Sequence, residues 1–250
     1  PTAYFASIAF NQNPLPISIN GVREINHMLF ETMDRYGIDD VPLLFMEHMR
    51  VMFELDVDVE IKSKMQRPLS YLRMLRGWFF DSNRPEGAVI KGWAESRFGL
   101  RTLYHCEPIK GITHSSYLQY MTEKMHHRFH SNSIYAQFDL LFEYCQYFWK
   151  RFGPTKRKLD LYRGMNSLSN DSSIVEKMSK KQWIVRNNCM NSYSKSIERA
   201  SEFGDVILKA KVPFEKIFCS PEIIPGKLPS YEHEYLILGG DYLSDVVDFF

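Results

Sequence analysis

The sequence predicts an α+β protein in which a mostly helical part, residues 1–153, precedes a strand-rich part, residues 154–250. Two observations lead to this prediction. Apolar residues recur at helical spacing from about residue 20 to 153, whereas beyond the Gly153-Pro154 break they form short runs with strand character. The later runs are joined by loops and not by regular crossover helices, which argues against a doubly wound parallel sheet.

The helical part contains several amphipathic stretches. Between Val22 and Met33, apolar side chains recur three or four positions apart, as on one face of a helix. By the same criterion we expect further helices over residues 41–55, 70–80, 88–98, 117–129 and 134–152. Gly37, Gly99 and Gly153 stand where C-caps are expected, because glycine readily adopts the left-handed backbone that often ends a helix.

The second part changes period. Runs rich in Leu, Ile, Val and aromatic residues predict strands over residues 159–163, 183–186, 205–212 and 235–238. Asn191–Ser194 has the composition of a hydroxyl-rich strand end. A short helix over residues 197–203 interrupts the strands, and Ser194 or Ser196 is suited to be its N-cap.

Composition excludes several classes of protein. The 250 residues, 44% of them hydrophobic, are enough to bury a substantial core, and a net charge of +1 disfavours a nucleic-acid partner or a polybasic membrane contact. The four cysteines are far apart and form no CxxC pair, so we expect reduced thiols. No apolar run approaches the roughly 18–20 residues that span a bilayer. The sequence begins at Pro1, so it says nothing about a targeting or secretion segment that precedes it.

Three short motifs carry candidate chemistry: Glu232-His233-Glu234, Arg163-Gly164 and the hydroxyl-rich strand end Asn191–Ser194. In Glu232-His233-Glu234, two carboxylates two residues apart share one face of a strand and can divide acid and base roles. Arg163-Gly164 ends a predicted strand, where a guanidinium fork suits a pyrophosphate and glycine permits close backbone approach. Taken singly, each motif has a commoner explanation. The first is more often a solvated glutamate pair, the second an arginine before a turn, and the third a helix N-cap.

The order of these motifs is more informative than any one of them. An arginine strand, a Ser-aromatic-Ser strand and a turn-rich loop ending in Glu-x-Glu resemble the R-S-E class of ADP-ribosyltransferases. Longer segments narrow the resemblance to the dinitrogenase reductase ADP-ribosyltransferase family, and it spans nearly the whole chain. These segments are residues 10–14, 75–78, 81–83, 86–93, 95–99, 136–141, 143–147 and 198–204. One mild departure is Tyr193-Ser194, where the family pattern has Phe-Thr.

The resemblance implies a fold, an activity and residue roles. The fold would be a mixed β core of two packed sheets beside the helical part, and the enzyme an NAD+-protein-arginine ADP-ribosyltransferase with NAD+ as co-substrate and no metal. Arg163 would hold the NAD+ phosphates, Gly164 the nicotinamide amide, and Ser192 the nicotinamide ribose. Glu234 would be the catalytic glutamate, and Glu232 would receive the acceptor arginine. Tyr162, Tyr193 and Ser194 complete the predicted NAD+ site.

Several questions stay open from the sequence. The segment between Arg76 and Arg97 is a candidate cleft-lining or docking surface, but its residues cannot be assigned individually. We interpret His126, His127 and His130 as part of a basic helix face and not as a metal site, because no Cys, Asp or Glu stands at ligand spacing around them. An NAD+ glycohydrolase and a catalytically dead binding module are the rival functions.

The target is the least determined point. The resemblance implies dinitrogenase reductase as the acceptor and the bacterial cytoplasm as the location. The chain is rich in Ile, Phe, Ser and Met where the family has many Arg and Ala, which leaves room for a relative with a changed target. Such a relative could be a secreted effector that acts in a host cytosol on another enzyme of nitrogen metabolism, such as glutamate dehydrogenase.

Overall fold

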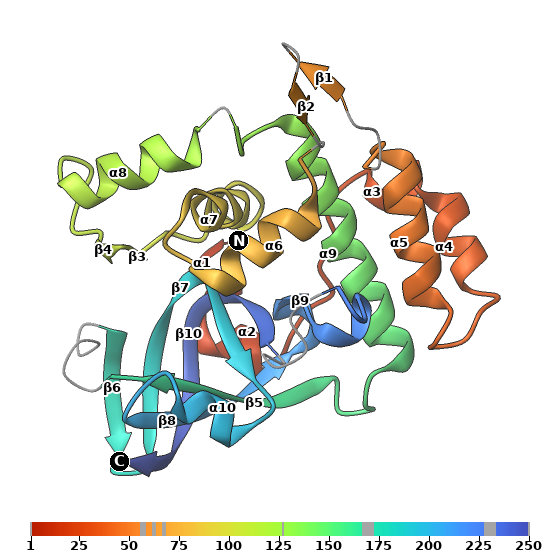
Figure 1. Cartoon of the computed structure of the whole chain (residues 1–250). Helices are drawn as coiled ribbons and strands as arrows, with labels where there is room; N and C mark the ends of the chain where they lie inside the picture. Colours follow the sequence, from red (N-terminus) through yellow and green to blue (C-terminus); the bar gives the residue numbers. More distant parts are fainter. Residues whose placement is uncertain are drawn as a thin grey trace.

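The computed structural model describes residues 2–55, 59–61, 64–66, 69–126, 128–166, 173–227 and 234–249. Helices dominate up to residue 152 and strands after it, as predicted. In Figure 1 the helices α3 to α9 lie on one side of the molecule, and the strands β5 to β8 and β10 lie on the other together with α2 and α10. The division at residue 153 stays a prediction, because one hydrophobic cluster extends from Phe5 through the helices to Tyr242.

The helices and the two small hairpins of the first part have the following bounds. They are α1 (Thr2–Phe5), α2 (Ile8–Gln12), α3 (Val22–Ile25), α4 (His27–Met33), α5 (Val41–Met52), β1 (Val59–Ile61), β2 (Lys64–Gln66), α6 (Tyr71–Phe80), α7 (Pro85–Phe98), β3 (Tyr104–His105), β4 (Glu107–Pro108), α8 (Ser115–Lys124) and α9 (Asn132–Phe152). The sequence did not indicate α1, α2 or the hairpins, which are too short to show a period.

Local capping explains where the longer helices begin and end. The side chains of Ser70 and Ser131 accept hydrogen bonds from Arg73 N and Ile134 N, which satisfies donors at the starts of α6 and α9. Gly99 ends α7 with φ 67°, as expected of a left-handed C-cap. Gly153 is the C-cap of α9, with extended backbone. Helix α4 ends at Met33 with Asp34 as its C-cap, so the C-cap prediction for Gly37 was wrong.

Helix α9 is the central support of the first part. Most of its side chains from Ile134 to Trp149 are buried, so it is apolar nearly all round. Its Asp139 accepts hydrogen bonds at 2.7 Å from Trp93 Nε1 and from two nitrogens of Arg97, which ties α7 to α9. Phe138 and Trp93 both contact the ring of Phe218 and thereby join these helices to the sheet.

The second part contains β5 (Lys158–Met165), β6 (Ile174–Ser179), β7 (Gln182–Ser194), α10 (Ile197–Ser201), β8 (Val206–Pro213), the short 3-10 turns η2 (Phe214–Lys216) and η3 (Pro221–Ile223), β9 (Ile217–Cys219) and β10 (Glu234–Phe249). Ser196 is the N-cap of α10 and accepts from Arg199 N at 3.1 Å. The strands β6 and β9 were missed, because β6 is mostly exposed and β9 is three residues long.

The described strands of this part form one antiparallel six-stranded sheet in the order β6-β7-β5-β8-β10-β9, with a further pairing between β7 and β10. The expectation of two packed sheets was therefore wrong. The physical reason is the length of β7 and β10, 13 and 16 residues. After a register shift between Leu238 and Gly240, β10 continues along β7 and then onto β8, so hydrogen bonding is not interrupted.

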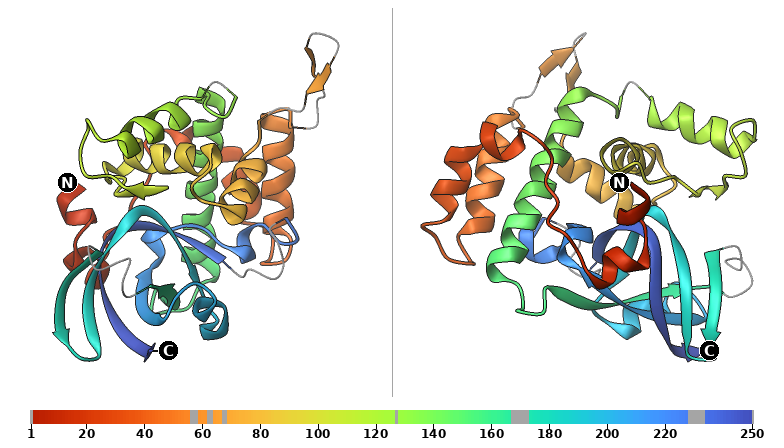
Figure 2. Two further views of the ribbon diagram at one scale, coloured as in Figure 1. Left: turned by 60° about the vertical axis from the view of Figure 1, so that its left-hand side comes forward. Right: turned by 180° about the vertical axis from the view of Figure 1, so that it is seen from behind.

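The amino-terminal segment packs against the sheet. In Figure 2 the first two helices lie beside the last strand, although they come from opposite ends of the chain. Asp241 N donates to Ala6 O at 2.7 Å, and Asn11 Nδ2 donates to Asp241 O at 3.0 Å. This contact joins α1 and α2 to β10 and helps to fix the strand that carries Glu234.

Candidate active site

Three strands meet at the predicted catalytic residues. Ser194 is the register partner of both Tyr162 on β5 and Glu234 on β10, so the three strands approach one another at the end of β7. Side chains two residues apart share a strand face, which places Ser192 with Ser194 and directs Tyr193 to the opposite face. Residues far apart in the sequence are thus brought together by strand pairing.

Arg163, Ser192 and Glu234 are linked by hydrogen bonds. Arg163 Nη1 donates to the Ser192 carbonyl oxygen at 3.1 Å, and Ser192 Oγ donates to Glu234 Oε2 over a longer 3.5 Å. Burial lowers the pKa of Arg163, an effect that Tyr193 and Glu234 oppose. An arginine nevertheless stays charged at any physiological pH, so the strand end presents a fixed cation beside a carboxylate.

Tyr193 supports this group from the core side. Its ring is buried, the Arg163 guanidinium lies 5.8 Å from the ring centroid, and Asn187 Nδ2 donates to its hydroxyl at 2.7 Å. Burial raises the pKa of Tyr193, so its hydroxyl remains protonated. The Tyr193 hydroxyl is therefore paired with the buried amide of Asn187.

Gly164 has a steric reason to be glycine. A Cβ at this position would lie 2.0 Å from the Ala200 carbonyl oxygen of α10. Close packing of β5 against α10 explains the residue from the protein itself, whereas the sequence suggested close approach to a ligand. The predicted backbone contact of Gly164 with nicotinamide stays a prediction.

Trp78 on α6 is a site residue that sequence reasoning did not assign. Its indole Nε1 donates to Ser192 Oγ at 3.0 Å, and the side chain is almost fully buried. The hydroxyl that contacts Glu234 is therefore also held by the helical part. The only signal in the sequence was the density of Trp, Asp and Asn after Arg76, which marked the segment but no single residue.

A cavity of about 540 Å³ contains these groups. Its size is within the range of small-molecule sites, roughly 300–1,000 Å³. Its lining includes every described residue of the predicted NAD+ site, namely Tyr162, Arg163, Gly164, Ser192, Tyr193, Ser194 and Glu234. From the candidate segment between Arg76 and Arg97, residues 78–82 and Lys91 also line it. Glu232 lies outside the described residues, so its predicted position beside the acceptor is not placed.

A chain of polar contacts leads from the cavity wall at Lys91, which lies against the Trp78 ring, to Glu123 on α8. Lys91 Nζ donates to Tyr104 O at 3.2 Å and contacts His105 Nδ1 at 3.1 Å, and His105 Nε2 contacts Glu123 Oε2 at 2.9 Å. A neutral imidazole with its proton on Nε2 satisfies both contacts. Burial and the neighbouring Lys91 lower the pKa of His105, and burial lowers the pKa of Lys91 to about 8.

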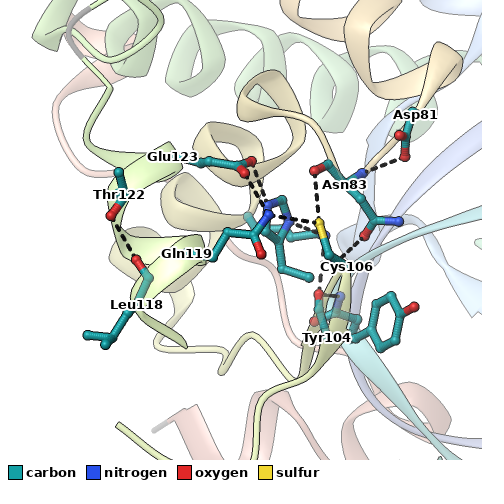
Figure 3. Close-up of polar contacts among 11 residues, drawn as sticks. Asp81, Asn83, Tyr104, Cys106, Leu118, Gln119, Thr122 and Glu123 are labelled. Carbon is teal, nitrogen blue, oxygen red and sulfur yellow. Dashed lines mark hydrogen bonds and ion pairs between the residues drawn. The ribbon is translucent and has the colours of Figure 1, made fainter. Parts of the chain in front are cut away.

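The turn between β3 and β4 joins this wall to α6 and α8. Cys106 adopts a left-handed backbone with φ 59°, and its N–H donates to Asn83 Oδ1 at 2.9 Å. Figure 3 shows Cys106 between Asn83 and Gln119, with Glu123 and Tyr104 nearby. The Gln119 amide donates to Cys106 Sγ at 3.4 Å. These contacts fix the backbone of Tyr104, whose carbonyl binds Lys91.

Comparison with known proteins shows the family of this chain. The family model of the dinitrogenase reductase ADP-ribosyltransferases (DRAT) matches residues 1–246. This chain belongs to that family. It is 41% identical over 251 residues to the NAD(+)--dinitrogen-reductase ADP-D-ribosyltransferase of Rhodospirillum rubrum, a match that covers 97% of this chain and 91% of that protein. No solved structure matches the chain.

Other predictions from the sequence can be compared with the described part of the family member. All four cysteines are free thiols. No group of three or more His, Cys, Asp and Glu suited to a metal ion is present among the described residues, which do not include His127. The rings of His126 and His130 lie beside Phe129 and Tyr135. Within the described ranges, no helix is both long and apolar enough to cross a membrane.

Proposed function

We propose that this protein transfers ADP-ribose from NAD+ to an arginine of dinitrogenase reductase and releases nicotinamide. Membership of the family and the name of the Rhodospirillum relative support the activity and the acceptor. The observation that carries the proposal is the convergence of Arg163, Ser192 and Glu234 in one cavity. We place the reaction in the bacterial cytoplasm.

Arg163 supplies the charge that binds the dinucleotide. A planar guanidinium donates two parallel hydrogen bonds to phosphate oxygens and does not lose its proton near neutral pH. Its bond to the Ser192 carbonyl fixes the guanidinium within the cavity. In the proposal, the diphosphate lies against Arg163 and the nicotinamide ribose lies toward Ser192 and Glu234.

Glu234 acts on the ribose. When the bond between C1′ and the nicotinamide nitrogen breaks, nicotinamide leaves with the electron pair and positive charge develops on the sugar. A fixed carboxylate that binds a ribose hydroxyl stabilises this charge most strongly in the transition state. Ser192 and Trp78 orient the carboxylate through the chain from indole N–H to serine hydroxyl to Glu234.

Glu232 is proposed to prepare the acceptor. A guanidinium is a poor nucleophile because its lone pairs are delocalised and it is protonated, with a pKa above about 12. A carboxylate two residues before Glu234 can orient one guanidinium nitrogen toward C1′ and accept the proton lost when the new C–N bond forms. The products are ADP-ribosyl-arginine, nicotinamide and one proton.

The test is incubation of dinitrogenase reductase with labelled NAD+ and this protein, followed by mass spectrometry of the modified residue. The wild type should label one arginine, and Glu234→Gln should abolish labelling. Glu31→Gln, a change of an exposed carboxylate on α4, is the matched control and should label normally. Glutamate dehydrogenase is tested in parallel as the alternative acceptor.

The same experiment separates the rival functions. A glycohydrolase would consume NAD+ in the wild type without labelling any protein. Intact NAD+ and an unlabelled acceptor would indicate a catalytically dead binding module. Glu232→Gln should retain NAD+ hydrolysis and lose transfer to arginine, because in hydrolysis the nucleophile is water and no guanidinium has to be oriented by a carboxylate. Unchanged transfer by Glu232→Gln would refute the role proposed for that residue.

A further inference from the structure

Exposed aromatic side chains gather at the mouth of the cavity. Among the described Phe, Tyr and Trp residues, the most exposed are Phe80 at 78%, Phe203 at 57%, and Tyr36 and Tyr104 at 43% each. All of them except Tyr36 line the cavity that contains Glu234. Aromatic residues are enriched at protein interfaces, and apolar surface left exposed next to a site is typical of partner binding.

Phe80 is presented rigidly. It is the last residue of α6, two residues after the buried Trp78 that binds Ser192, so the backbone beneath its ring is held by the site. The Arg84 guanidinium lies over the ring at 5.1 Å from its centroid. The ring therefore has a defined position although most of its surface is open to solvent.

Helix α6 also contacts the segment that leads to the catalytic glutamate. Arg76 Nε, on the same helix, donates to the carbonyl oxygen of Lys227 at 3.3 Å. Lys227 is the last described residue before the stretch that contains Glu232 and ends at Glu234. Helix α6 thus reaches from the cavity, which Phe80 lines, to the backbone of Lys227.

Tyr104 and Phe203 extend the aromatic surface on either side of the mouth. Tyr104 is on β3 and belongs to the helical part, whereas Phe203 follows α10 in the strand-rich part. An acceptor protein whose arginine enters this cavity must lie against both parts. A small free guanidine can enter the cavity and react without binding the aromatic surface at its mouth. This surface therefore matters only for a macromolecular acceptor.

We propose that Phe80, Tyr104 and Phe203 form the docking surface for the acceptor protein, dinitrogenase reductase. This inference rests on the proposed function and specifies how the acceptor is recognised. The surface fits a partner that carries an arginine within an apolar patch, because aromatic rings bind both apolar groups and the face of a guanidinium. Truncation of aromatic anchors at the centre of an interface commonly weakens binding tenfold or more.

The experiment compares wild type, Phe80→Ala, Phe80→Tyr and Met28→Ala. Met28 is 72% exposed on α4, outside the cavity lining, and is the matched control for loss of an exposed apolar side chain. Steady-state labelling is measured with dinitrogenase reductase and, separately, with agmatine, a free alkylguanidine. NAD+ affinity is followed by fluorescence quenching, with Trp78 as a reporter in the cavity.

For Phe80→Ala we expect the KM for dinitrogenase reductase to rise about tenfold or more. Its losses with agmatine and in NAD+ affinity should be much smaller than its loss with dinitrogenase reductase, Phe80→Tyr should restore most of the loss, and Met28→Ala should behave as wild type. An unchanged KM for the protein acceptor, or an equal loss with agmatine, would overturn the docking proposal. If the wild type modifies neither acceptor, the proposed function itself fails, which is a different result.

Discussion

Lys91 should make the stability of the protein depend on pH in a direction that the structure determines. The ammonium group is 1% exposed and contacts a carbonyl and a neutral imidazole, with no carboxylate in direct contact among the described residues. Burial is the main cause that lowers its pKa from 10.5 to about 8, and Cys189, Cys106, Asp81 and Glu123 oppose it. Lys91→Met keeps an unbranched side chain and removes the titrating group.

The sign and size follow from linkage. Below pH 8 both the folded and the unfolded lysine are charged, and the cost of the buried charge is fully present. Between pH 8 and 10.5 the folded state loses its proton first, so the cost is relieved and stability rises with pH. With one pKa unit equal to about 1.36 kcal/mol, the wild type should gain about 2 kcal/mol relative to Lys91→Met between pH 7 and 9.5.

The assay is urea unfolding of both proteins at pH 7, 8, 9 and 9.5, each in a Cys106→Ser background. Burial raises the pKa of that thiol in the folded state, so it adds a pH dependence of its own that Lys91 influences, and it is removed from both proteins. Burial raises the pKa of Cys189 to about 12, which keeps this second thiol protonated throughout. A difference in unfolding free energy that stays constant over this range, or that moves against the wild type, would refute the reasoning.

Three further predictions concern the site. Arg163→Lys should raise the KM for NAD+ about 10- to 100-fold, because a point charge replaces a bidentate fork, and initial rates at varied NAD+ will measure it. Trp78→Phe removes the donor to Ser192 Oγ and should lower the unfolding free energy by about 1 kcal/mol and kcat by up to about tenfold, as seen by denaturation and by turnover at saturating NAD+. Gly164→Ala should destabilise the fold by about 1–3 kcal/mol or more, because its Cβ meets a backbone carbonyl at 2.0 Å, and thermal unfolding will detect this.

The sequence was most informative where a local signal agreed with the tertiary environment. The apolar period of residues 134–152 identified α9 within two residues, because nearly every side chain of that helix is buried. The strands around Arg163 and Val206 were also predicted, since their Leu, Ile and Val runs face the core. By contrast, β6 has a mostly exposed pattern that no periodicity distinguishes from a loop.

Sheet architecture could not be predicted in the same way. Whether two long strands belong to one sheet or two depends on which edges pair after a register shift. In this protein β10 pairs with β7 over residues 234–245, with β9 at Leu236 and Ile237, and with β8 over residues 244–249. These pairings join residues that lie between 17 positions apart, at Leu236 and Cys219, and 63 positions apart, at Asp245 and Gln182, so no short window of sequence contains all the partners.

What the sequence by itself determined was the order of structure along the chain, the family resemblance and the residue types of the site, Arg163, Ser192 and Glu234. These are properties of short segments, whose composition and spacing already carry the information. Only the tertiary structure decided that Trp78 binds Ser192, that Lys91 lies buried behind it and that Gly164 packs on α10. Each of these contacts is made across separate elements, and its energy depends on burial and distance, which exist only once the chain has folded.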